Sequence, residues 1–95
     1  MKALPKSVKV GPVVYDVKIA PRLAADGAYG AFARPEALIE IHPDMAMSMQ
    51  EITLWHELVH IILVHGGIRV HEEVVIDALA HGIVGVLQDN PDLTK

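Results

Sequence analysis

Two histidines and a glutamate stand at a spacing that could hold and use a metal ion: His56, Glu57 and His60. If this segment is helical, residues four apart lie on one face, a turn from each other. Both imidazoles can then converge on one cation, and zinc is commonly bound by histidine nitrogen. Glu57 is displaced by about 100° around the helix. It lies beside the cation, where it can take a proton from an activated water molecule.

The residues around this motif favour a buried helix. Most positions from 52 to 64 are apolar, and a helix that is apolar on all sides is buried. The run is too short, and too polar at its centre, to cross a bilayer. Burying histidines and a carboxylate is costly without partners, and a metal would supply them. The alternative is a domain without a metal, in which His56 and His60 are core residues satisfied by carbonyl or carboxylate groups.

Length and composition limit the number of domains, the kinds of partner and the cellular compartment that we expect. Ninety-five residues predict one domain over 1–95 with a small core. The formal charge is −4 with no basic block, which argues against nucleic acid as a partner. Cysteine is absent, so no disulfide or thiolate ligand is possible, as is typical of a reducing compartment. No signal segment or membrane span is recognised. We therefore expect a cytoplasmic protein that binds no membrane.

The first half of the chain has the pattern of a short antiparallel sheet. Runs rich in β-branched residues are separated by turn signals such as Gly11-Pro12, which predicts a hairpin. The expected strands are 7–10, 13–19, 28–33 and 38–42. Pro43-Asp44 ends this region, because proline cannot occupy a central ladder.

Two helices are expected in the second half. The first begins near Ser48, where Ser48 and Glu51 could form a capping box, and ends near His65 before Gly66-Gly67. The second runs from about 72 to 87 or 88, with its apolar residues packed on the core. The predicted fold class is therefore α+β: a short N-terminal antiparallel sheet of three to four strands, then two packed helices. The motif lies on the first long helix.

A catalytic zinc site needs a third protein ligand and an open position. Glu73 is our choice, because the glycine turn after the first helix can bring a second helix back beside it. Asp77 follows one helical turn later and could accept the free ring N–H of a ligand histidine. Glu72 is the competing ligand, although an acidic first turn is also favoured by the helix dipole alone.

Four further side chains could stabilise a developing oxyanion: His65, His71, His81 and Tyr29. The sequence does not choose among them, and for each one alone a non-catalytic place is the simpler interpretation. A third histidine at the spacing of the metzincin motif is excluded, because position 66 is glycine.

At this point the chain resembles small zincin metallopeptidases of the gluzincin type, similar to phage-type and ImmA/IrrE-like minimal enzymes. The resemblance rests on His56-Glu57-Leu58-Val59-His60 and on Glu73-x-x-x-Asp77, and covers about residues 50–90. It implies zinc on His56, His60 and Glu73, with Glu57 as base and Asp77 as support. It also implies that the strand Leu38–Ile41 pairs with an extended peptide substrate. The extended C-terminal segment of those relatives has no counterpart, so a homodimer or a partner protein could complete the cleft.

The sequence therefore predicts zinc-dependent hydrolysis of peptide bonds, with one zinc ion per chain and a peptide or protein as substrate. The alternative function is a zinc-binding regulatory or interaction module without turnover. Retention of Glu57 favours the enzyme, because a purely structural zinc site needs no base and closes its fourth position. The same ligand set also accepts cobalt, manganese or nickel.

Overall fold

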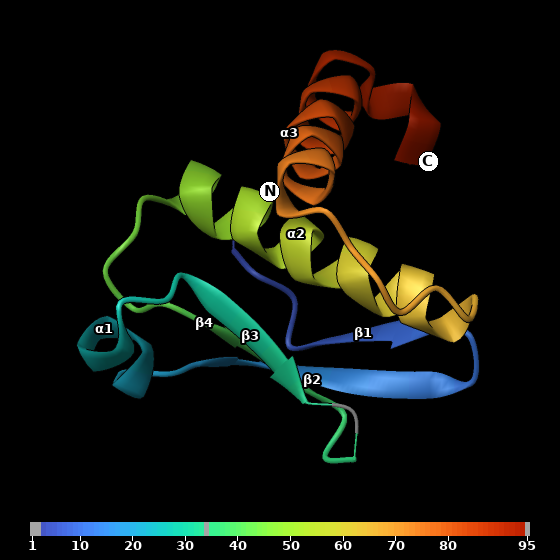
Figure 1. Ribbon diagram of the computed structural model, residues 1–95. Helices are drawn as coiled ribbons and strands as arrows, with labels where there is room; N and C mark the ends of the chain where they lie inside the picture. Colours follow the sequence, from blue (N-terminus) through green and yellow to red (C-terminus); the bar gives the residue numbers. More distant parts are fainter. Residues whose placement is uncertain (1–2, 34, 95) are drawn as a thin grey trace.

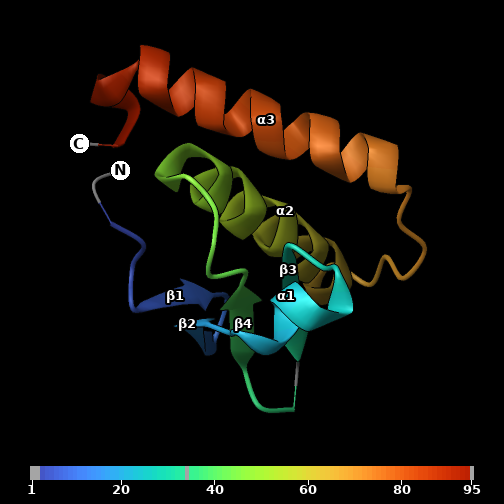
Figure 2. The same cartoon turned by 90° about the vertical axis from the view of Figure 1, so that its left-hand side faces the viewer.

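The computed structural model describes residues 3–33 and 35–94, and it is built in three layers (Figures 1 and 2). A sheet forms the first layer, helix α2 lies across one face of it, and helix α3 packs on the side of α2 away from the sheet. The elements in chain order are β1 (Ser7–Val10), β2 (Val13–Ile19), α1 (Arg22–Asp26), β3 (Gly30–Ala33), β4 (Leu38–Ile41), α2 (Met47–His65), α3 (Glu73–Asp89) and a 3-10 turn (Pro91–Thr94). The predicted α+β class is therefore confirmed.

The sheet is mixed and not wholly antiparallel, which corrects the expectation from the sequence. Its strand order is β1-β2-β4-β3; β1–β2 and β3–β4 pair antiparallel, but β2 and β4 pair parallel. A parallel pair needs a crossover connection of about a dozen residues or more. The chain supplies it between Ile19 and Leu38 with β3 and with the short helix α1, which lies between two of the expected strands where no helix was predicted.

The order of strands also shows that the prediction for the strand that pairs with a substrate peptide is wrong. β4 (Leu38–Ile41) is bonded on both sides, to β2 and to β3, so its backbone groups are already used. Among the described strands, β3 forms one edge of the sheet and pairs only with β4. If an extended peptide pairs with this side of the sheet, it can do so only along β3.

The core lies between the sheet and α2. It is formed by buried side chains from both layers, namely Tyr15, Ile39, Ile41, Leu54, Leu58 and Ile61. Burial of each large aliphatic side chain is worth roughly 1.5–3 kcal/mol. This packing fixes the rotation of α2 about its axis. The histidines of the motif face the side of α2 where α3 and β3 meet it.

Helix α2 begins within one residue of the predicted start and ends as predicted, but its N-terminal cap differs from the prediction. Its first residue is Met47, and its N-cap is Ala46, with no side-chain cap bond. The expected capping box is wrong, because Ser48 lies inside the helix and Glu51 is buried at 6% exposure. At the other end Gly66 donates its N–H to the carbonyl of Ile62, Gly67 donates its N–H to the carbonyl of Val64, and Gly67 has φ +85°. Glycine adopts this left-handed conformation without a steric penalty.

Helix α3 buries a narrower face than the sequence indicated. Ile76, Ala80 and Val84 are buried against α2, but Val75 and Leu79 remain 49% and 46% exposed. The apolar residues of α3 spread around most of its circumference, whereas α2 covers only one side of it (Figure 2). The periodicity of the sequence does not show which part of such a wide apolar face is covered. In the described chain, no helix combines the length and the apolar character that crossing a bilayer requires.

Gly30 lets β3 lie close to α2. A β-carbon at this position would stand 2.7 Å from Thr53 Cγ2, 3.3 Å from the carbonyl oxygen of Glu40 and 3.4 Å from Glu57 Cγ. Contacts below 3.0 Å force a displacement, and overpacking typically costs about 1–3 kcal/mol. A side chain at position 30 would therefore push β3 away from the helix that carries the motif.

We expect Gly30→Ala to lower the free energy of unfolding by about 1–3 kcal/mol in urea titrations. Thr53→Ser removes the Cγ2 methyl group that the new β-carbon meets first. The double variant Gly30→Ala/Thr53→Ser should therefore lose less than the sum of the two single changes. Strictly additive losses would show that the close approach at Gly30 is not limiting.

Candidate metal centre

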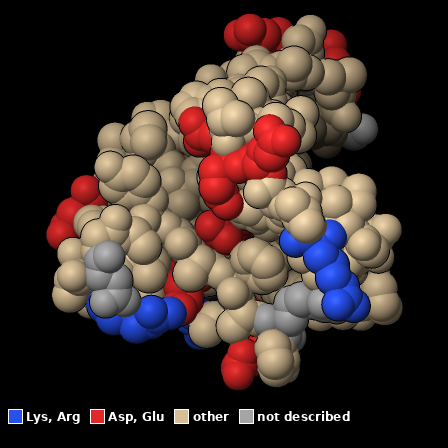
Figure 3. All heavy atoms as spheres, viewed as in Figure 1, with Lys and Arg blue, Asp and Glu red and all other residues tan. Residues whose placement is uncertain are grey.

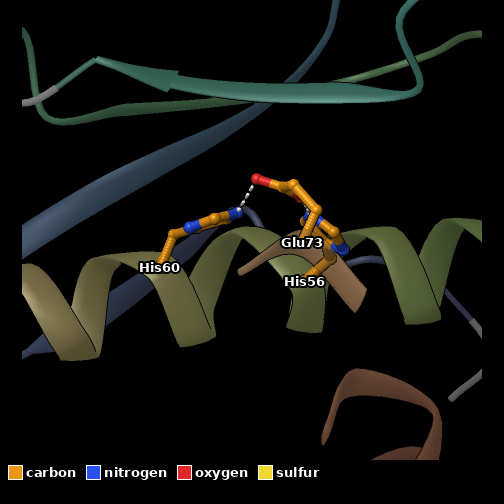
Figure 4. Close-up of side chains that lie close together, drawn as sticks. All are labelled: His56, His60 and Glu73. Atoms are coloured by element: carbon orange, nitrogen blue, oxygen red, sulfur yellow. Dashed lines mark hydrogen bonds and ion pairs between the residues drawn. The ribbon is translucent and has the colours of Figure 1, made fainter. Parts of the chain in front are cut away.

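Three potential ligand atoms come together where the start of α3 meets the middle of α2. His56 and His60 project from the same side of α2, and Glu73, the first residue of α3, reaches back between them (Figure 4). Glu73 Oε2 lies 2.9 Å from His56 Nε2, and Glu73 Oε1 lies 3.1 Å from His60 Nε2. The donor atoms of all three residues lie within 4.8 Å of one another. We call these three residues the cluster.

The chemistry of the cluster fits a metal ion. Two imidazole nitrogens and one carboxylate oxygen form a set that transition metals accept, and three protein ligands leave a position open for water. The side chains of His56 and His60 are 22% and 12% exposed, whereas that of Glu73 is 70% exposed. A cation could therefore enter from solvent on the Glu73 side. The cluster could hold a metal ion, and its geometry does not select which metal.

Charges on this face of the molecule suit a cation. Acidic side chains gather at its middle, and lysines and arginines lie toward its margins (Figure 3). Two acidic residues on the first turns of α3, Glu73 and Asp77, have carboxylates within 3.6 Å of the rings of His56 or His60. A surface region of one sign raises the local concentration of ions of the opposite sign.

Glu73, and not Glu72, belongs to the cluster. Glu72 is the N-cap of α3 with an extended backbone (φ −87°, ψ 117°), and it is exposed. Glu73 begins the helix one residue later, so the rotation of about 100° per residue sends the two carboxylates in different directions. The role of Glu73 as ligand stays a prediction.

We expect Glu73→Gln to weaken zinc affinity more than the roughly 10- to 100-fold typical of residues that only support a ligand. Glu72→Gln removes the same charge from the neighbouring position and should leave the affinity close to that of the wild type. Isothermal titration of zinc into both metal-free variants checks this pair. Equal losses in the two variants would mean that general electrostatic attraction, not ligation, explains the effect.

Glu57 lies beside the cluster but is not part of it. The residue is 7% exposed, and its Cγ approaches the backbone of β3 at Gly30. Burial raises the pKa of the Glu57 carboxyl from 4.5 to about 7; His56 lowers it and the charge of Glu73 raises it. A carboxylate with a pKa near neutrality is suited to take up and release a proton at physiological pH.

An open cleft of about 310 Å³ gives access to these groups. Its charged and polar lining includes His56, Glu57, Asp77 and His81, and its remaining wall is formed by Tyr29, Gly30, Met49, Ile52 and Thr53. The wall therefore comes from three elements: the segment entering β3, the N-terminal half of α2 and the first turns of α3. A substrate in the cleft would touch Glu57 and one side of the cluster.

His60 is held in a state that suits ligation. Burial lowers the pKa of His60, and the neighbouring rings of His56 and His71 lower it further, whereas the charge and hydrogen bond of Glu73 oppose the shift. Phe32 of β3 adds an apolar wall, with its ring centroid 6.2 Å from that of His60. Since metals bind the neutral imidazole, a lowered pKa keeps His60 available to a cation at lower pH.

Asp77 lies behind His56, as expected from its position one turn after Glu73. Its Oδ1 is 3.6 Å from His56 Nδ1, and its Oδ2 is 3.6 Å from His81 Nδ1. The distance to His56 exceeds that of a hydrogen bond, so in this state Asp77 acts on His56 through its charge.

The four side chains considered for oxyanion stabilisation fall into two groups. His81 and Tyr29 line the cleft beside Glu57. His71 instead contacts His60 from behind, with 2.6 Å between their Nδ1 atoms. His65 lies in the last turn of α2, where the buried hydroxyl of Tyr15 is 2.9 Å from its Nε2. The structure therefore places only the first two where they could reach a substrate.

Two features of the site were missed by the sequence reasoning. His71 lies in the irregular segment between α2 and α3, where no periodicity indicates which way a side chain points. The cleft wall at Gly30 depends on the pairing of β3 with β4 and on its approach to α2. A glycine inside a predicted strand, here 28–33, does indicate a close backbone approach, and this was the only available signal.

Comparisons with protein-family models, with curated proteins and with solved structures give no match to this chain. The resemblance to small zincins therefore rests on the motif residues and their geometry alone.

Proposed function

We propose that this protein hydrolyses peptide bonds with zinc held by His56, His60 and Glu73. The observation that carries the proposal is the position of Glu57. It is a buried carboxylate that lines the same cleft as His56 of the cluster, yet it lies outside the ligand set. A structural metal site has no use for such a group, whereas hydrolysis requires a base beside the metal.

Zinc bound in the cluster would polarise the scissile carbonyl and lower the pKa of water. Glu57 takes a proton from the attacking water and returns it to the leaving amine. Its pKa near 7 in the metal-free chain falls when a cation lies close, because an opposite charge favours the ionised form. Glu57 would therefore act as the base at neutral pH.

The free edge of β3 gives an extended peptide a place to lie. Tyr29 accepts a hydrogen bond from the N–H of His42 at 2.8 Å, so in an antiparallel ladder the backbone groups of Gly30 and Phe32 face away from β4. Phe32 lies beside His60, and Tyr29 and Gly30 line the cleft. A peptide paired with β3 would pass the cluster and Glu57 along its length.

Of the two cleft residues that could bind the oxyanion, Tyr29 is the better donor. His81 Nδ1 donates to the carbonyl of Asp77 at 2.9 Å, so in the neutral ring Nε2 has no proton to give. The hydroxyl of Tyr29, on a side chain 65% exposed, can rotate and donate. We propose Tyr29 as the oxyanion donor and His81 as a neighbour held by Asp77.

The test of the proposed function is metal-dependent cleavage of a peptide library. The protein should cleave after zinc loading, stop when a chelator removes the metal, and recover when zinc is restored. Mass spectrometry of the products identifies the scissile bond. Zinc binding without turnover of any peptide would support the regulatory or interaction module instead.

A further inference from the structure

Behind the metal-facing side of His60 lies a second imidazole, that of His71. The two Nδ1 atoms are 2.6 Å apart, the ring centroids are 4.8 Å apart, and the ring planes are inclined by 26°. His71 Nε2 lies 2.7 Å from the carbonyl oxygen of Ile68. Three groups are therefore joined in series: the carbonyl of Ile68, the ring of His71 and the ring of His60.

The chemistry of these groups decides where the protons lie. A carbonyl oxygen can only accept, so Nε2 of His71 carries the proton that it donates to Ile68. In the neutral ring, Nδ1 of His71 then has a free lone pair and accepts. His60 must therefore donate from its own Nδ1, which leaves Nε2 of His60 without a proton.

The free lone pair of His60 Nε2 points into the cluster, 3.1 Å from Glu73 Oε1. In the metal-free chain this contact needs a proton shared with Glu73, because two acceptor atoms at this distance repel each other. A metal ion bound to both atoms would replace that proton. The hydrogen bond from His60 Nδ1 to His71 therefore leaves His60 Nε2 as the unprotonated nitrogen that a metal ion binds. Such partners fix the tautomer and the orientation of a ligand ring.

We propose that His71 is a positioning residue, which accepts the Nδ1–H of His60 and thereby presents Nε2 of His60 to the metal. This inference rests on the metal site of the proposed function but not on peptide hydrolysis. The proposal also assigns a structural role to the irregular segment between α2 and α3. The carbonyl of Ile68 orients His71, so the segment that returns the chain to Glu73 also orients His60.

The pair His71→Phe and His71→Asn tests the proposal. Phenylalanine keeps a ring but offers no acceptor, whereas the side-chain oxygen of asparagine can take the place of Nδ1. We expect His71→Phe to weaken zinc affinity by about 10- to 100-fold, and His71→Asn to recover most of that loss. His65→Phe removes a histidine outside the cluster and should leave the affinity unchanged.

A second measurement does not depend on either variant folding. In zinc-loaded wild-type protein labelled with ¹⁵N, a hydrogen bond between the rings should give a nitrogen–nitrogen coupling between His60 Nδ1 and His71 Nδ1. Absence of this coupling in protein that binds zinc would overturn the role of His71 and leave the metal site standing. Its presence in protein that cleaves no peptide would support His71 while the hydrolase proposal fails. Wild-type protein that binds no zinc would overturn both.

Discussion

Glu57→Gln should leave zinc bound and lower the rate of peptide hydrolysis by about 10²- to 10⁴-fold, the range typical of general acid–base catalysis. Glutamine keeps the size of the buried side chain but cannot take the proton of the attacking water. Zinc binding should persist, because Glu57 lies outside the cluster. The measurements are kcat/KM on the cleaved peptide and the zinc content of the same sample.

Glu72→Gln is the matched control, because it removes one carboxylate from an exposed position outside the cleft. It should keep the wild-type rate. Wild-type turnover by Glu57→Gln would remove Glu57 from the role of base and leave the cleft without an assigned proton acceptor. Loss of zinc in Glu57→Gln would instead show that the residue helps to hold the metal.

The same substitution should stabilise the metal-free protein at neutral pH. Burial raises the pKa of Glu57 from 4.5 to about 7 in the folded chain, so the folded state retains a proton that the unfolded state releases first. Below pH 4.5 both states are protonated and the group costs nothing. Between pH 4.5 and 7 stability falls as pH rises, and above pH 7 the full cost remains.

The cost corresponds to about 3 kcal/mol at pH 8, because each unit of pKa shift is worth about 1.4 kcal/mol. Glutamine does not ionise, so the difference in unfolding free energy between Glu57→Gln and wild type should grow in favour of the variant from pH 4.5 to 7. Urea titrations in the presence of chelator measure that difference, since the other titrating groups are common to both proteins. A difference that is constant with pH would show that Glu57 has an ordinary pKa in the folded state.

Local patterns predicted those parts of the fold that neighbouring residues determine. The hairpin from Ser7 to Ile19 has the predicted bounds, because strand-forming residues flank a turn signal on both sides. The end of α2 was also predicted, because two glycines follow the last apolar turn. The parallel pairing of β2 with β4 could not be predicted, because it depends on where a crossover lands and not on the residues of either strand.

Those positions in the cluster that follow from helix geometry could be predicted from the sequence. His56 and His60 share a face because they are four residues apart, and Glu73 was preferred over Glu72 by its alignment with Asp77. The placement of His71 depends on the irregular segment after Gly67, where the backbone has no period. Apolar residues occupy most of the circumference of α3. Tertiary packing therefore decides which of them are buried and which stay exposed.

The most direct test of the account is the zinc content of purified protein, measured by plasma mass spectrometry beside His60→Ala. His60 supplies a ligand atom to the cluster and takes no other part in the proposed chemistry. We expect about one zinc per chain in the wild type and none in the variant. No zinc in the wild type, and no change in its melting temperature when zinc is added, would contradict the account. His56 and His60 would then contact Glu73 without a metal ion.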